Sequence, residues 1–278
     1  MIGQTAALAN AVAWAASNVV VKTISGTVRP VPVSAVHTLA TALTLIVLTA
    51  GLGRMDDLFS MPIEPLSYLV ASAIANTAGQ ITFLYAISLG AVGWTFTMTN
   101  SIFIPLSVIA GWLFLGDDVN AWTWVGGGAI MIGLFLLNRP ADTLRRPPGS
   151  TASRNPPAGA DRIAPLAVVM AAASGVLWTA GLVLTARGLQ NTDLMAAATV
   201  RSGIPALLFI LWVASRRGSP LKAIPRRTWG PLLLSAAFGL CSLLTWMFAL
   251  QHTEAGLTAI LSSTAPVWAL VMGAVFLR

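Results

Sequence analysis

The chain has 278 residues, of which 56% are hydrophobic and only 9% carry a charged side chain, and its mean hydropathy is +0.79. Soluble domains carry about 25% charged residues, so this composition excludes an ordinary soluble protein. The net charge of +7 comes from basic residues gathered in two loops, as the positive-inside rule predicts for a membrane protein, so no nucleic-acid partner is needed to explain it. The sequence predicts an all-α integral membrane protein.

Nine apolar blocks are each long enough for a membrane-spanning helix, which needs about 20 residues. In chain order they cover residues 2–21, 31–52, 66–88, 93–115, 120–138, 163–186, 194–214, 229–250 and 255–277. The first block lacks the basic start and the small-residue cleavage site of a signal peptide, so we interpret it as a retained helix. Residues 139–162, which are rich in Pro, Arg, Ser and Gly, are predicted to form a linker loop.

The two parts beside this linker, residues 1–138 and 163–278, show an internal repeat. A shift of 164 residues places Trp14 on Trp178 and His37 on Arg201, and further matches follow in order across four helices. Because five helices are an odd number, a second copy enters the membrane from the opposite face, which gives the inverted repeat typical of transporters. The fifth block has no counterpart, so we interpret the chain as a 5+5 plan that stops before a tenth helix. A protein of nine helices is the alternative.

Arg201 lies inside the apolar block AAATVRSGIPALLFILW, residues 196–212. An arginine near the bilayer centre costs at least about 2.5–3.5 kcal/mol, which indicates a functional position or a compensating contact. Its equivalence with His37 in the repeat favours two polar residues on a cavity wall. The alternatives are that Arg201 snorkels toward the membrane surface near Asp193, and that His37 bonds a neighbouring hydroxyl.

Further polar and aromatic side chains recur every three or four residues on one face of a block, as in the series Asn10, Trp14 and Asn18. Such faces predict a shared polar interior. Together with Arg201 and His37, the predicted substrate-binding residues are Trp14, Asn18, Asn76, Gln80, Asn100, Trp178 and Trp246. The alternative for such side chains is helix packing through interhelical hydrogen bonds, which contribute about 0.6 kcal/mol each.

The distribution of charged side chains restricts the solutes. Every Asp and Glu lies in a loop or at a helix end, whereas proton-coupled export of cations usually relies on a carboxylate within the membrane. An interior arginine favours neutral, zwitterionic or anionic solutes, because a guanidinium binds a carboxylate through parallel hydrogen bonds. His37 is the only deep side chain that titrates near neutral pH. Enzyme motifs such as HExxH are absent, and with one cysteine and two histidines no metal or other cofactor is expected.

Three stretches resemble the EamA-type members of the drug/metabolite transporter superfamily. They are WAASNVVVK at residues 14–22, LYAISLGAVGWTFTMTNSIFIPLSVIAGWLFLGDD at 84–118 and FALQHTEAGLTAILSSTAPVWALVMGAVFL at 248–277. The resemblance covers nearly the whole chain and implies a 5+5 helical fold around a central cavity that moves small organic solutes. The chain departs from the family in lacking the last helix and in having His37 where the first half often carries arginine.

These observations predict a permease that moves small organic metabolites, amino acids or related carboxylates, outward by alternating access, as a monomer or homodimer. Its partners are a small-molecule substrate and the lipid bilayer, with no nucleic acid. The count of Lys and Arg on alternating sides predicts a multi-pass inner-membrane protein with loops 139–162 and 215–228 in the cytoplasm. The alternative is a membrane sensor or scaffold with a transporter-like fold, in which the polar faces are packed shut instead of meeting at an open cavity.

Overall fold

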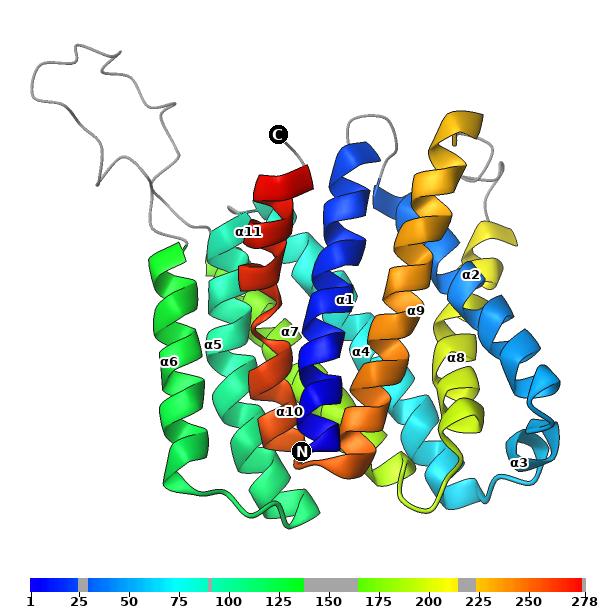
Figure 1. Cartoon of the computed structure of the whole chain (residues 1–278), viewed down its shortest axis with the longest axis horizontal. Coiled ribbons are helices and arrows are strands. Elements are labelled where there is room, and N and C mark those ends of the chain that lie inside the picture. The colour runs from blue at the N-terminus through cyan, green and yellow to red at the C-terminus, as the bar shows by residue number, and fades with distance from the viewer. Residues whose placement is uncertain (25–29, 90–91, 138–164, 215–223, 277–278) are drawn as a thin grey trace, which may run out of the picture.

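The computed structural model describes residues 1–24, 30–89, 92–137, 165–214 and 224–276. The predicted linker 139–162 and residues 215–223 of the second basic loop lie outside these ranges. Within them all regular structure is helical, and the helices stand side by side (Figure 1). The prediction of an all-α membrane protein is confirmed, since eight segments are long and apolar enough to cross a bilayer and α6 is a shorter apolar helix.

The helices follow the predicted apolar blocks, with ends that differ by a few residues. In chain order they are α1 (Ile2–Ile24), α2 (Pro30–Gly51), α3 (Met55–Phe59), α4 (Ile63–Leu89), α5 (Val92–Ala110) with the π-helical turn η1 (Gly111–Leu115), α6 (Ala121–Leu137), α7 (Pro165–Gly188), α8 (Leu194–Ala214), the 3-10 turn η4 (Arg226–Thr228), α9 (Trp229–His252), α10 (Ala255–Ser262) and α11 (Ala265–Phe276). The short helix α3 was not predicted.

The last predicted span is divided into two helices. α10 ends at Ser262 and α11 begins at Ala265, and the N–H of Thr264 bonds the carbonyl of Leu261 at 3.2 Å in a tight turn between them. Pro266 explains the break, because it has no N–H to donate to the carbonyl of Ser262 and its ring crowds the preceding turn. Irregular backbone at membrane depth is tolerated where it contacts protein or lines a cavity.

The most extensive helix contacts join the two sides of the linker. α1 packs against α9 and α4 packs against α7, while α2 contacts α8 and α9, and α8 contacts α4. In Figure 1, α1 and α9 lie next to each other in the front layer, with α4 and α7 behind them. Each pair combines one helix from residues 1–138 with one from residues 163–278. This packing of helices from one half against helices from the other half fits an inverted repeat. The repeat itself stays a prediction.

Candidate functional site

Adjoining cavities occupy the space between these helix pairs. One of about 600 Å³ lies between α1, α2, α4, α8 and α9, and another of about 330 Å³ lies beside the α10–α11 break. Of the nine predicted binding residues, the first cavity is lined by Trp14, Asn18, His37, Gln80 and Arg201, and the second by Trp14, Asn76, Asn100, Trp178, Arg201 and Trp246. The structure therefore brings all nine to one connected region, with Trp14 and Arg201 at the junction.

Arg201 has no ionic partner within the described residues. Its Cζ atom lies 4.7 Å from the ring centroid of Trp246, and its Nε atom is buried without a hydrogen-bond partner. Asp193, toward which snorkelling was the alternative, lies 3.9 Å from Nε of Arg54 instead. A desolvated cation–π contact is worth about 2 kcal/mol, whereas an arginine deep in a bilayer costs at least about 2.5–3.5 kcal/mol. The difference favours water in the cavity or an anionic ligand beside Arg201.

The helix α8 lacks one regular backbone hydrogen bond at Arg201. Pro205 lies inside α8 and has no N–H to donate to the carbonyl of Arg201, which is four residues earlier. Both residues line the cavity of about 600 Å³. The guanidinium of Arg201, which only donates hydrogen bonds, thus belongs to the same residue as a backbone carbonyl that lacks its usual N–H partner in the helix.

His37 links α2 to α9. Its Nε2 atom lies 2.5 Å from Oγ of Ser235, and that hydroxyl donates to the carbonyl of Leu232 at 2.9 Å. Because the serine proton is used in this way, Ser235 accepts from Nε2–H, and Nδ1 of the neutral ring keeps its lone pair. A Cβ atom at Gly239 would lie 3.8 Å from Nδ1 and 3.8 Å from Oγ of Ser17, so larger side chains there would crowd this nitrogen. The hydrogen bond to a hydroxyl, considered as an alternative for His37, is therefore present, and the second ring nitrogen has no hydrogen-bond partner among the described residues.

Asn10 connects the α10–α11 break to α1 and α9. Its Nδ2 atom donates to Oγ of Ser262 at 2.8 Å, and its Oδ1 atom accepts from Oγ of Ser242 at 2.6 Å. Next to it, Oγ of Ser263 donates to Oδ1 of Asn100 at 3.4 Å. All five residues line the cavity of about 330 Å³. Asn10 lies on the predicted polar face of the first block, but neither it nor the three serines were among the predicted binding residues.

Aromatic rings form another wall. Centroids of neighbouring rings lie between 5.1 and 6.3 Å apart along the series Phe103, Trp178, Phe83, Phe96 and Trp14. These rings line a further cavity of about 550 Å³. The three phenylalanines were not predicted to be part of the site, because a phenylalanine facing lipid and one facing a cavity look the same within a block that is apolar all round.

The amide side chains offer unused acceptors. Nδ2 of Asn18, Asn76 and Asn100 each donates to the backbone carbonyl four residues earlier, at 2.7–2.9 Å. The side-chain oxygens of Asn18 and Asn76, and the whole amide of Gln80, make no hydrogen bond with the rest of the described chain. A solute with N–H groups would find acceptors at these positions.

Two glycines position Asn76 and Trp178 at the contact between α4 and α7. A Cβ atom at Gly181 would lie 2.1 Å from Nδ2 of Asn76, and one at Gly79 would lie 2.6 Å from Cδ1 of Trp178. Carbon atoms do not approach other atoms so closely, so each glycine fits where a larger residue would displace a neighbour that lines the cavities.

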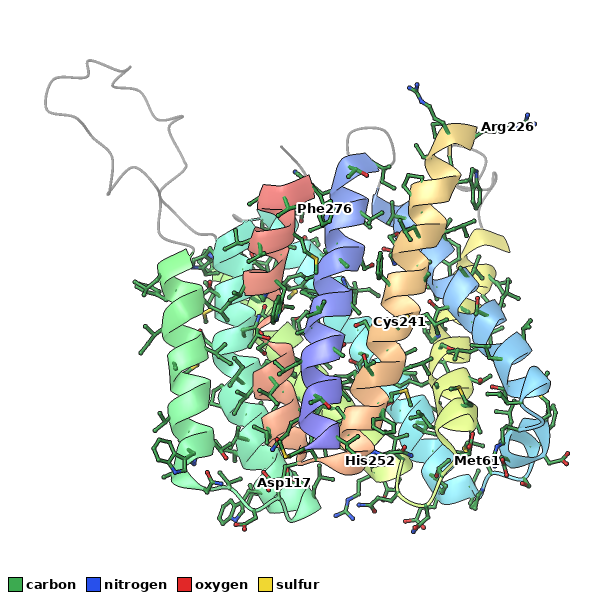
Figure 2. The ribbon with its side chains drawn as sticks, in the orientation of Figure 1. Met61, Asp117, Arg226, Cys241, His252 and Phe276 are labelled. Carbon is green, nitrogen blue, oxygen red and sulfur yellow. The ribbon has the colours of Figure 1, made fainter. Side chains whose placement is uncertain are left out.

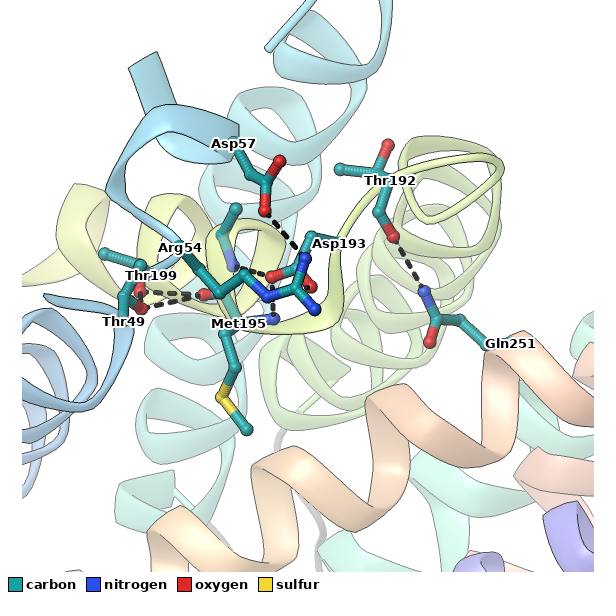
Figure 3. A network of polar contacts seen from close by, with 9 residues as sticks. Thr49, Arg54, Asp57, Thr192, Asp193, Met195, Thr199 and Gln251 are labelled. Carbon is teal, nitrogen blue, oxygen red and sulfur yellow. Dashed lines mark hydrogen bonds and ion pairs between the residues drawn. The ribbon is translucent and has the colours of Figure 1, made fainter. Parts of the chain in front are cut away.

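Polar contacts join the helices at one end of the bundle, where α2 and α3 meet the start of α8 (Figure 3). The hydroxyls of Thr49 and Thr199 lie 2.8 Å apart. Arg54 pairs with Asp57 at 3.2 Å and lies 3.9 Å from Asp193, whose other oxygen accepts from two N–H groups at the start of α8. Since exposed ion pairs contribute little, the buried threonine pair is the more secure link.

Acidic side chains gather at the same end, where Figure 2 labels Asp117 and His252, with Arg226 at the opposite end. Oδ2 of Asp117 accepts from the N–H of Gly256 at 3.1 Å. Burial raises the pKa of Glu254, and the negative charges of Asp117 and Asp118 raise it further. Among the described residues, no three His, Cys, Asp or Glu side chains are grouped to hold a metal ion.

We compared the fold and the sequence of this chain with those of known proteins. A solved structure described only as "Crystal structure of protein" superposes with a TM-score of 0.76 over 98% of this chain and 87% of its own length, at 16% identity, which shows a shared fold alone. A probable 4-amino-4-deoxy-L-arabinose-phosphoundecaprenol flippase subunit, ArnE, from Aeromonas salmonicida is 31% identical over 70 residues. That match spans 25% of this chain and 60% of the flippase subunit. The profile of the EamA-like transporter family matches residues 1–139 and 165–278, so the chain belongs to this family of membrane transporters, within the drug/metabolite transporter superfamily.

Proposed function

We propose that this protein moves amino acids or related small carboxylates outward across the cell inner membrane by alternating access. The observation that carries the proposal is Arg201, a cation without an ionic partner in the described chain, at the junction of two cavities. A carboxylate beside it would supply the missing counter-charge and accept two hydrogen bonds. The carbonyl of Arg201 and the free oxygens of Asn18 and Asn76 would accept hydrogen bonds from an ammonium group.

An open interior supports transport over the alternative of a sensor or scaffold. In a scaffold the polar faces are expected to be packed shut. Here the predicted binding residues border cavities of about 600 and about 330 Å³, which are in the size range of small-molecule sites. No Asp or Glu of the described residues lines either cavity, and the hydrogen-bond partner of His37 there is Ser235 instead of a carboxylate, which favours a solute that crosses unchanged.

We infer that the cavity faces the cytoplasm in this conformation. It extends to Val21 and Val33, at the ends of α1 and α2 nearest to residues 25–29, whereas the opposite end is held by Thr49 and Thr199. The end that carries Val21 also carries Lys22, Arg226 and Arg227. By the positive-inside rule this basic end is cytoplasmic, and so are loops 139–162 and 215–228.

Transport by purified protein in liposomes tests the proposal, with a panel of labelled amino acids and hydroxy acids and with choline as a cationic control. We expect carboxylates to move and choline to stay. Arg201→Ala is expected to lower the initial rate about tenfold or more, because hydrogen bonds to a charged group are worth about 1.5–3 kcal/mol. Arg226→Ala, which removes an exposed arginine outside the cavities, is the matched control and should transport normally. If a folded Arg201→Ala variant matches the parent protein, or if no carboxylate moves in the parent protein, the proposal is wrong.

A further inference from the structure

The central space continues sideways between α2, α4 and α8. A cavity of about 570 Å³ lies there, and it shares with the cavity of about 600 Å³ the residues Ser34, Thr38, Gln80, Leu84, Arg201 and Pro205. The two are therefore parts of one space that meet at Arg201. The side part is lined by α2, α4 and α8 alone, without the inner helices α1 and α9.

The outer edge of this side part faces the bilayer. Ile81 of α4 is 63% exposed, Leu84 is 41% exposed and Leu208 of α8 is 46% exposed, and all three line the side cavity. They belong to segments long and apolar enough to span a membrane, and the exposed apolar surface of such a segment lies against lipid. Between α4 and α8 the cavity that contains Arg201 therefore adjoins the hydrocarbon region.

The lining of this side cavity changes from polar beside Arg201 to apolar at its outer edge between α4 and α8, which we call the opening. Arg201 lies at the inner end as a cation without an ionic partner in the part of the chain that the structure describes. Ser34, Thr38 and Gln80 supply hydrogen-bonding groups along the way, and Ile81, Leu208 and Phe209 supply an apolar edge. A molecule with an anionic head and an alkyl chain matches both ends, because its chain stays in lipid while its head leaves the membrane surface for the guanidinium.

The geometry points to single-chain anionic amphiphiles as a substrate class of this transporter, with the carboxylate at Arg201 and the alkyl chain leaving between Ile81 and Leu208. This inference rests on the proposed function, since it uses the same anion site, and it adds a route from the bilayer to the route from water. Short carboxylates then reach Arg201 from the basic end of the bundle, and alkyl carboxylates reach it through the opening between α4 and α8.

Photo-crosslinking provides the first test. The probe is a decanoate with a diazirine near the end of its chain, and the full chain is embedded in phosphatidylcholine nanodiscs. After irradiation, peptide mass spectrometry should locate the label on residues 81–84 and 205–209. We expect excess unlabelled decanoate and the Arg201→Gln variant each to reduce this labelling about tenfold, because both remove the head-group contact. Labelling that is spread evenly over the lipid-facing helices and that resists competition overturns the inference, whatever the transport assay shows.

A matched pair of neighbouring leucines provides the second test. Leu208 lines the opening, whereas Leu207 is 53% exposed on the same helix and does not line it. In liposomes, Leu208→Trp should raise the decanoate concentration that half-inhibits transport of a short carboxylate about tenfold, with the KM of the short carboxylate unchanged. Leu207→Trp should change neither value. Equal effects of the two variants, or no inhibition by decanoate, overturn the inference and leave the proposed function standing. If no short carboxylate moves at all, the proposed function fails, and the crosslinking result alone decides whether the opening binds the amphiphile.

Discussion

The guanidinium of Arg201 on α8 lies over the indole ring of Trp246 on α9, with 4.7 Å between Cζ and the ring centroid. Among the described residues, this ring is the one side-chain partner that we observe for the guanidinium, and it belongs to a different helix. The face of an indole attracts a cation but satisfies none of its N–H groups. The contact therefore holds Arg201 in place and leaves its donors available.

The strength of this contact can be measured by a double-mutant cycle of Trp246→Leu and Arg201→Leu. We expect a coupling free energy of about 1–2 kcal/mol, because a desolvated cation–π pair is worth about that much. Thermal unfolding followed by far-ultraviolet circular dichroism gives the required stabilities. Trp246→Phe retains a weaker aromatic face, so its loss should be smaller than that of Trp246→Leu. A coupling energy near zero would show that the two side chains are neighbours without mutual stabilisation.

Alanine at Gly79 or Gly181 is expected to disturb both stability and transport. The added methyl group must displace Trp178 in the first variant and Asn76 in the second. Overpacking of this kind costs about 1–3 kcal/mol, and the displaced side chains line the cavities, so the KM for the solute should rise. Gly128→Ala is the matched control, because a Cβ atom at Gly128 would meet no atom within 4 Å. Thermal unfolding measures the loss of stability, and the liposome assay measures the change in KM. Equal unfolding midpoints and equal KM values for all three variants would contradict the close approach of α4 and α7.

Glu254→Gln is expected to raise the midpoint of thermal unfolding near neutral pH. Burial first, and then the charges of Asp117 and Asp118, raise the pKa of Glu254 in the folded protein, so folding favours its neutral form. The stabilisation of the variant is therefore full above the folded pKa and disappears as the pH falls through that pKa toward the unfolded value of about 4.3. Unfolding midpoints measured from about pH 8 down to about pH 5 test this sign. Glu64→Gln, at the start of α4, is the control, and a gain for Glu254→Gln that grows on acidification would refute the expected linkage.

Cysteine labelling of intact cells tests the proposed orientation. In a Cys241→Ser background, which removes the sole native cysteine, Asp56→Cys in α3 places a thiol at the acidic end and Arg226→Cys places one at the basic end (Figures 1 and 2). We expect a membrane-impermeant maleimide to label the first variant in intact cells and the second only after permeabilisation, because the basic end is proposed to be cytoplasmic. The reverse pattern would mean that the cavity in this conformation faces outward.

The lengths of the apolar blocks predicted the positions of the spans, because a bilayer requires a continuous apolar stretch of nearly fixed length. The break near Ser263 was missed, although the sequence SSTAP contains the proline that causes it. The five-residue helix α3 is too short to show a period. Arg201 and His37 stood out because polar groups are costly in lipid, and both border the cavities.

The pairing of helices could not be predicted from a single sequence. In a soluble helix the apolar face points to its partner, but a membrane helix is apolar on the lipid side as well. Nothing local in α1 therefore identifies α9 as its neighbour, and nothing in α4 identifies α7. For the same reason the serines around Asn10 and the phenylalanines around Trp178 could not be distinguished from residues that only pack helices together.

The hydrogen bonds of Asn10 also have a consequence for biosynthesis. Its partners Ser242 and Ser262 follow it by 232 and 252 residues along the chain. Because ribosomes add about 5–20 residues per second, α1 waits roughly 10–50 seconds in the membrane before either serine has been made. During that interval both hydrogen bonds are absent, and the amide can bond only to water, to lipid head groups, to another protein or, as Asn18 does, to a carbonyl of its own helix. The hydrogen bonds that join α1 to α9 and to the α10–α11 break can therefore form only after α9 and α10 have been made.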